Sequence, residues 1–109
     1  MWLTMNNDIK IRALLKDKTT ELKMIIIHPM DTGRRKNDAG EIIPAHFIEL
    51  LTVKLNDIVI LEAQWGTGIA KNPYLTFNLN NAKIGDKISV YWKDNLGETG
   101  FGESSIVQG

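Results

Sequence analysis

The feature that most constrains the fold of this chain is the alternation of apolar residues with a period of two. Ile9, Ile11, Ala13 and Leu15 lie two positions apart, and similar spacing returns in later segments. This period puts alternate side chains on one face of an extended strand, whereas a helix repeats every three or four residues. No segment shows convincing helical periodicity, so the sequence predicts an all-β protein.

About seven short strands account for the pattern. They are predicted at 9–15, 20–28, 46–55 and 58–65, around Leu75 to Leu79, around Ile88 to Trp92, and near 98–107, where Gly100 and Gly102 weaken the last strand. Strands at intervals of roughly 8 to 12 residues are typical of an immunoglobulin-like antiparallel β-sandwich. An open barrel is the main structural alternative.

Asn56-Asp57 marks the firmest hairpin in the chain. Both residue types tolerate the positive φ angles that a two-residue hairpin turn requires. Counting outward from this turn places Leu55 opposite Ile58 and Val53 opposite Ile60. The turn therefore predicts both the pairing of the two strands and its register.

The length of the chain, 109 residues, fits one domain with one core. We expect this domain to cover residues 9–109 and residues 1–8 to form an N-terminal tail. The tail lacks the basic and apolar regions of a secretory signal peptide. No apolar run approaches the roughly 20 residues that span a bilayer. Taken alone, these features favour the cytoplasm.

The charges of the chain are balanced. Lys and Arg together number 13, as do Asp and Glu. Such a chain has no global field to attract nucleic acid or an anionic membrane surface, so neither is an expected partner. The sequence has no cysteine, which excludes a disulfide, a thiolate metal site and a cysteine nucleophile within it.

The chain contains two histidines, His28 and His46. Neither has a second histidine or a carboxylate at the spacing of a known zinc or iron motif, so we expect no metal and no cofactor. His28 continues one face of the strand at 20–28. We interpret it as a hydrogen-bonded residue that anchors the following loop, and His46 as a residue with a similar role.

No catalytic constellation stands out. Acid and base roles need two carboxyl groups with distinct environments across one cleft, and the sequence shows no such pair. The acidic residues considered are Asp31, Asp38, Glu41, Glu49 and Glu62. No serine lies in a G-x-S-x-G elbow, and Gly66-Thr67-Gly68 lacks the third glycine of a dinucleotide fingerprint. We therefore expect a protein that is not an enzyme.

Two loops, 28–36 and 65–74, carry the most distinctive residues. The first opens a polar, turn-rich stretch from Met30 to Pro44, which we interpret as a long loop or a β-ribbon. Its basic triplet, 34–36, suits contacts with a carboxylate or a phosphate, although loop charges are usually solvated. Loops on a rigid sheet scaffold commonly carry recognition residues, so the pattern favours a binding protein.

These motifs resemble those of SoxZ, the small subunit of the SoxYZ carrier in bacterial thiosulfate oxidation. The matching segments are His28-Pro29-Met30, Thr32-Gly33-Arg34-Arg35-Lys36, Gly40, Ile43-Pro44-Ala45, Trp65, Asn72-Pro73-Tyr74 and Trp92-Lys93-Asp94-Asn95 with Gly97. The resemblance runs through nearly the whole chain from about Ile9. Met1 to Asn7 shows no family pattern, and Asn56-Asp57 stands where relatives often have Asn-Gly.

The resemblance implies an immunoglobulin-like sandwich that forms the non-catalytic half of a heterodimer with SoxY. In this family SoxY carries sulfur intermediates on a cysteine near the end of a flexible arm, and other Sox enzymes act on them in transient contacts. The absence of cysteine fits this role, because a second thiol beside the adduct would invite thiol exchange. Family members work in the periplasm without a signal peptide of their own and are exported with SoxY.

For the SoxY interface we expect apolar and aromatic contacts from Met30, Phe47, Trp65, Pro73 and Tyr74. Arg34, Arg35 and Lys36 are expected to form a polar rim or a docking surface for a Sox enzyme. Without a partner, strands that are apolar on both faces favour a homo-oligomer. The main alternative is a free-standing immunoglobulin-like module that binds a carbohydrate or a peptide through its loops; a small hydrolase with an unrecognised site is the third.

Overall fold

The computed structural model describes residues 3–6 and 9–109. The described residues form nine strands: β1 (Leu3–Asn6), β2 (Ile9–Lys16), β3 (Thr19–Ile26), β4 (Ile48–Leu55), β5 (Ile58–Gln64), β6 (Tyr74–Asn80), β7 (Lys87–Asp94), β8 (Thr99–Ser105) and β9 (Val107–Gln108). This part of the chain contains no helix, and therefore none of the length and apolarity needed to cross a membrane. The all-β prediction is confirmed.

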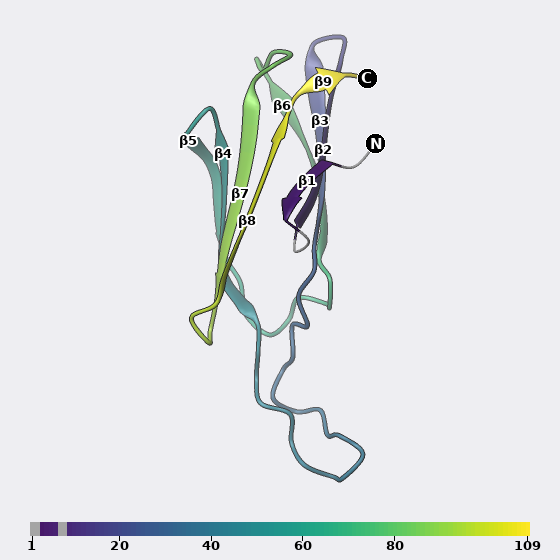
Figure 1. The fold of residues 1–109 in the computed structure, drawn as a ribbon, viewed down its shortest axis with the longest axis vertical. Helices are drawn as coiled ribbons and strands as arrows, with labels where there is room; N and C mark the ends of the chain where they lie inside the picture. The colour runs from purple at the N-terminus through teal and green to yellow at the C-terminus, as the bar shows by residue number, and fades with distance from the viewer. Residues whose placement is uncertain (1–2, 7–8) are drawn as a thin grey trace.

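The strands form two sheets. In the first sheet the order is β1-β2-β3-β6. The short β9 runs parallel to β2 and pairs with its C-terminal end, on the same edge of β2 as β1. In the second sheet the order is β5-β4-β7-β8, with every pair antiparallel. Figure 1 shows the two sheets facing each other. The predicted immunoglobulin-like sandwich is the observed fold.

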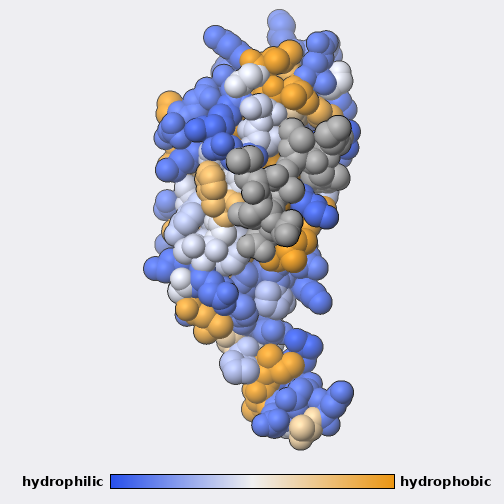
Figure 2. All heavy atoms as spheres, viewed as in Figure 1, coloured by the Kyte–Doolittle hydropathy of each residue, from blue (hydrophilic) through white to orange (hydrophobic). Residues whose placement is uncertain are grey.

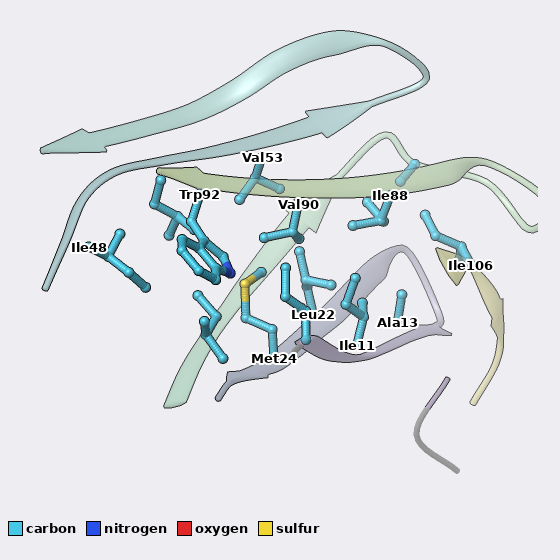
Figure 3. Close-up of a cluster of buried hydrophobic side chains, with 14 of the residues drawn as sticks. Ile11, Ala13, Leu22, Met24, Ile48, Val53, Ile88, Val90, Trp92 and Ile106 are labelled. Carbon is cyan, nitrogen blue, oxygen red and sulfur yellow. The ribbon is translucent and has the colours of Figure 1, made fainter. Parts of the chain in front are cut away.

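The core lies between the inward faces of the two sheets (Figure 3). Its fully or almost fully buried apolar residues are Ile9, Ile11, Ala13, Leu22, Met24, Ile26, Met30, Ile48, Leu51, Val53, Ala82, Ile88, Val90, Trp92 and Ile106. The period of two explains the selection, because β2 turns Ile9 and Ile11 inward and leaves Lys10 exposed. Burial of each large aliphatic side chain contributes about 1.5–3 kcal/mol, which makes this cluster the main stabilising element.

The hairpin prediction is confirmed, and its register is corrected. Asn56 and Asp57 have φ angles of 49° and 69°, as a two-residue turn requires. Leu55 pairs with Ile58 as predicted, but Val53 pairs with Leu61 instead of Ile60. The register shifts between Val53 and Lys54, where a bulge inserts an extra residue into β5. The alternation of apolar residues did not indicate this bulge.

The N-terminal segment differs in part from the expected tail at residues 1–8. Leu3–Asn6 forms β1 and pairs antiparallel with β2. Its residues do alternate between apolar and polar, but a strand of four residues is too short for this pattern to indicate it. Residues 1, 2, 7 and 8 lie outside the described residues.

The glycines of the last long strand have a packing role. Gly100 and Gly102 do not interrupt β8, which pairs with β7 along its whole length. A Cβ on Gly100 would overlap the indole of Trp92, and a Cβ on Gly102 would crowd Ile9. The two glycines therefore permit the close approach of core side chains to the β8 backbone.

Residues 31–46 form a projecting segment that we call the arm (Figure 1). Isolated antiparallel bridges join Asp31 to His46 and Lys36 to Ile42. The arm gives the molecule its long axis, since the overall dimensions are 53 × 24 × 21 Å. Figure 2 shows hydrophobic and hydrophilic residues together on this projection. The prediction of a long loop or a β-ribbon is confirmed in its first form, because the arm is a loop joined by two isolated bridges and contains no strand.

One side of the sandwich remains open. On the other side β8 packs against β1 and β2 and joins the two sheets. On the open side the edge strands are β5 and β6, and these two strands make no comparable contact with each other. Their inward-facing apolar residues are only half-buried: Leu61, Ala63, Leu75, Phe77 and Leu79. The apolar interior therefore reaches the surface along this edge.

Candidate functional site

A cluster of ionisable side chains lies at the base of the arm. The Asp94 carboxylate, at the end of β7, is fully buried. Its Oδ2 accepts hydrogen bonds from Nε2 of His28 at 3.1 Å and Nε2 of His46 at 2.7 Å. Its Oδ1 accepts the backbone N–H groups of Leu96 at 3.0 Å and Glu98 at 2.8 Å. We call His28, His46 and Asp94 the His-Asp cluster.

The tautomer of His28 follows from its contacts. The backbone N–H of Met30 donates to Nδ1 of His28 at 3.1 Å, so the neutral ring carries its proton on Nε2, facing Asp94. The backbone of His28 also exchanges two hydrogen bonds with Asn72: its N–H donates to Oδ1, and its C=O accepts the N–H, each at 3.0 Å. The predicted role of His28 as a loop anchor is confirmed.

The hydrogen bonds keep Asp94 ionised. Burial by itself would raise the pKa of the Asp94 carboxyl, but the bonds from His28, His46 and the backbone N–H groups of Glu98 and Leu96 outweigh it. The net result is a pKa below the ordinary value of 3.8. The folded protein therefore holds a buried carboxylate whose charge is balanced by oriented donors.

The His-Asp cluster offers three ligand atoms that lie within 4.8 Å of one another. A cation bound to Nε2 of His28 would require the ring proton to move to Nδ1. There it would face the N–H of Met30, which already donates to that atom. The arrangement of donors therefore fits a hydrogen-bonded anchor better than a metal centre.

The anchor orients the arm. The backbones of Asp31 and His46 exchange N–H···O=C bonds of 2.7 and 2.9 Å across its base. The side chain of Asn95 accepts the N–H of Phe47 at 2.8 Å and donates to the C=O of Ala45 at 2.9 Å. The turn after β7 thus holds the returning strand of the arm. The predicted anchoring role of His46 is also confirmed.

Sequence reasoning did not assign Asp94 to the anchor. It lies 66 positions from His28 and 48 from His46, so no local spacing joins the three residues. The one local signal is the Asp94-Asn95-Leu96-Gly97 turn, in which Asp94 accepts backbone N–H groups on its C-terminal side.

Four of the residues expected at a partner interface line two grooves that share Trp65. Trp65, Pro73 and Tyr74 line a groove of about 370 Å³ at the open side, together with Ile69 and Leu75. Phe47 and Trp65 line a second groove of about 480 Å³. Because Trp65 belongs to both, we treat the residues Phe47, Trp65, Pro73 and Tyr74 together and call them the aromatic strip. Pro73 itself is buried and leaves little surface for a partner.

The fifth residue, Met30, lies elsewhere. It is 4% exposed and belongs to the core. Its Sδ accepts the backbone N–H of Ile48 at 3.3 Å. Met30 therefore stabilises the base of the arm from inside and leaves little surface for a partner.

The basic triplet lies on the exposed arm. Arg34, Arg35 and Lys36 are all exposed. Arg35 donates from Nε at 3.1 Å and from Nη2 at 2.7 Å to the same Asp31 oxygen. The triplet lies on the arm, whereas the residues of the aromatic strip lie outside it.

Comparison with known proteins supplies the family. No curated protein matches the chain. The family model described as "Sulphur oxidation protein SoxZ" matches residues 9–104. The matched residues include β2 to β7, the arm, the His-Asp cluster and the aromatic strip. This chain belongs to the SoxZ family of sulfur oxidation proteins.

Proposed function

We propose that this chain is the non-catalytic subunit of a SoxYZ sulfur carrier and pairs with SoxY, whose cysteine arm carries the sulfur intermediates. Membership of the SoxZ family gives the role in sulfur oxidation. The observation that supports pairing is the open side of the sandwich, where apolar residues of β5 and β6 remain half-buried. A partner that covers this edge would remove that apolar surface from water.

The exposed residues along this edge are suited to a protein partner. Ile58 and Val59 on β5 are 69% and 50% exposed, and Tyr74 on β6 is 56% exposed. The aromatic strip adds the ring of Trp65 to the same side. Aromatic and aliphatic side chains grouped in this way are typical of the buried centre of an interface. We therefore place the SoxY contact on the open side and the aromatic strip.

The His-Asp cluster supports a non-catalytic role. Catalysis requires ionisable groups that a substrate can reach, yet the side chains of His28 and Asp94 are 2% and 0% exposed. Both ring nitrogens of His28 and both oxygens of Asp94 already have structural partners. These groups orient the arm, and chemistry on the sulfur adduct is left to separate enzymes.

The remaining elements of the proposal concern place and partners. We propose that the protein works in the periplasm after export together with SoxY. The exposed Arg34 and Lys36 on the arm would form a docking rim for the other Sox enzymes. Such charged rims affect association rate and orientation more than affinity.

The test is co-expression with the cysteine-bearing protein encoded beside this chain, purification through a tag on this chain alone, and native mass spectrometry. A one-to-one heterodimer whose partner cysteine gains sulfur-containing mass with thiosulfate and the other Sox enzymes would support the carrier. A folded chain that does not bind this partner would refute the proposal. That result would favour a free-standing immunoglobulin-like module that binds a carbohydrate or a peptide.

A further inference from the structure

We propose that a pocket at the base of the arm binds a small sulfur oxyanion. The pocket has a volume of about 310 Å³ and is lined by Pro29, Met30, Asp31, Thr32, Arg35 and Lys71. It joins two segments distant in the sequence, the start of the arm and the loop before β6. The choice of a sulfur anion rests on the proposed function, whereas the preference for an anion follows from the lining residues.

The charge of the lining is positive. Asp31 is its one acidic residue, and Arg35 neutralises it through two bonds to the same carboxylate oxygen. Lys71 is exposed and makes no salt bridge within the described part of the chain. The pocket therefore keeps one uncompensated positive charge. An anion is the ligand that balances it.

The lining also supplies donors suited to several oxygens. The hydroxyl oxygen of Thr32 accepts the backbone N–H of Arg34 at 3.2 Å, so its own proton remains available to donate. Arg35 uses Nε and Nη2 for Asp31, which leaves Nη1 available. The ammonium of Lys71 has three donors. A tetrahedral oxyanion accepts such charge-assisted hydrogen bonds from several directions.

Backbone hydrogen bonds hold the two walls of the pocket. The paired hydrogen bonds between His28 and Asn72 hold Lys71 beside the start of the arm. The paired backbone bonds between Asp31 and His46 fix the other wall. A site of this kind loses less conformational freedom on binding than a mobile loop does.

Two sources can supply the same chemical group. One is a free anion such as thiosulfate. The other is a terminal sulfonate on an adduct attached to the cysteine of the partner. Both present a tetrahedral –SO₃⁻ group, and the experiment distinguishes them by using one probe for each.

The test is a two-dimensional ¹⁵N NMR titration of the full chain with sodium thiosulfate and, separately, with S-sulfocysteine. Ionic strength is held constant with sodium chloride, because screening alone changes exposed charges. We expect saturable shifts at the amides of 30–35 and 71. Lys71→Ala should weaken binding about tenfold or more, because it removes a charge-assisted bond. Lys18→Ala, in the exposed β2–β3 turn, is the matched control and should bind as the wild type does.

Saturation by thiosulfate that Lys71→Ala weakens would support a site for the free anion. Saturation by S-sulfocysteine alone would support recognition of the carrier-bound group. No saturable shift with either probe, or equal weakening in Lys71→Ala and Lys18→Ala, would overturn the proposal. Co-purification of the wild-type chain with SoxY separates the two proposals, because a heterodimer formed by a wild-type chain that shows no saturable anion binding would remove this inference and leave the carrier intact.

Discussion

His28 and Asp94 stand 66 positions apart, and Nε2 of His28 donates to Oδ2 of Asp94 over 3.1 Å. His28 follows β3 of one sheet, and Asp94 ends β7 of the other. His46, at the return of the arm, donates to the same oxygen. One buried carboxylate oxygen thus joins both sheets and the arm.

Replacement of Asp94 by Asn should destabilise the fold strongly. Each oxygen of the carboxylate accepts hydrogen bonds from two donors. The amide of Asn has one oxygen, so its NH₂ group would face the pair of N–H donors that the second carboxylate oxygen now binds. We expect a loss of about 3 kcal/mol in the free energy of unfolding, measured by urea denaturation. Asp38→Asn, on the exposed tip of the arm, is the control. Equal effects of the two changes would contradict the role of the cluster.

The stability of the protein should fall in acid in part because of Asp94. Its pKa in the folded protein lies below the ordinary 3.8, so its stabilising effect is fully present above that value. The effect is lost as the pH falls through the folded pKa. Urea midpoints measured from about pH 7 to about pH 3 should drop in the wild type and drop less in Asp94→Asn.

A second carboxylate acts in the same direction and needs its own control. The pKa of Asp86 is also lowered, first by a hydrogen bond with the side chain of Asn56 and then by one with the backbone of Lys83. The acid loss that remains in Asp94→Asn should therefore decrease further when Asp86→Asn is added. An unchanged acid profile in Asp94→Asn would show that Asp94 does not contribute.

Gly100→Ala should destabilise the sandwich by about 2 kcal/mol, because the new methyl group would overlap the indole of Trp92. Near-ultraviolet circular dichroism should report the displaced indole, and thermal unfolding should report the loss of stability. Gly66→Ala is the matched control, since no atom lies within 4 Å of a Cβ at that position. A Gly100→Ala protein with wild-type stability would show that the indole moves aside without cost.

If the proposed interface with SoxY is correct, Tyr74→Ala should weaken the heterodimer about tenfold or more, because truncation of a central aromatic residue removes much of the binding energy. The ring is 56% exposed, so the fold should survive its removal. Tyr91→Ala is a close control, because Tyr91 is 38% exposed on the outer face of the other sheet. Calorimetric titration with SoxY provides the measurement. A larger loss in Tyr91→Ala would place the interface on that other face.

Much of the fold follows from local patterns in the sequence. The alternation in β2 and the Asn56-Asp57 turn are local features, and local backbone preferences explain them. The sequence pattern did not predict the bulge between Val53 and Lys54 or the strand at Leu3–Asn6. Each depends on pairing with a neighbouring strand, and the spacing of apolar residues within one segment does not record that pairing.

The candidate sites divide in the same way. The sequence by itself indicated the family motifs and the loop-anchoring role of the histidines, and it predicted that the residues of the aromatic strip contact a partner. Only the tertiary structure brought Asp94 to His28 and His46, buried Met30, and placed Lys71 in a pocket with Arg35. The physical reason is that strand pairing and sheet packing bring together residues from separate parts of the chain. Local residue preferences determine the strands and turns, whereas contacts across the sandwich determine which side chains meet.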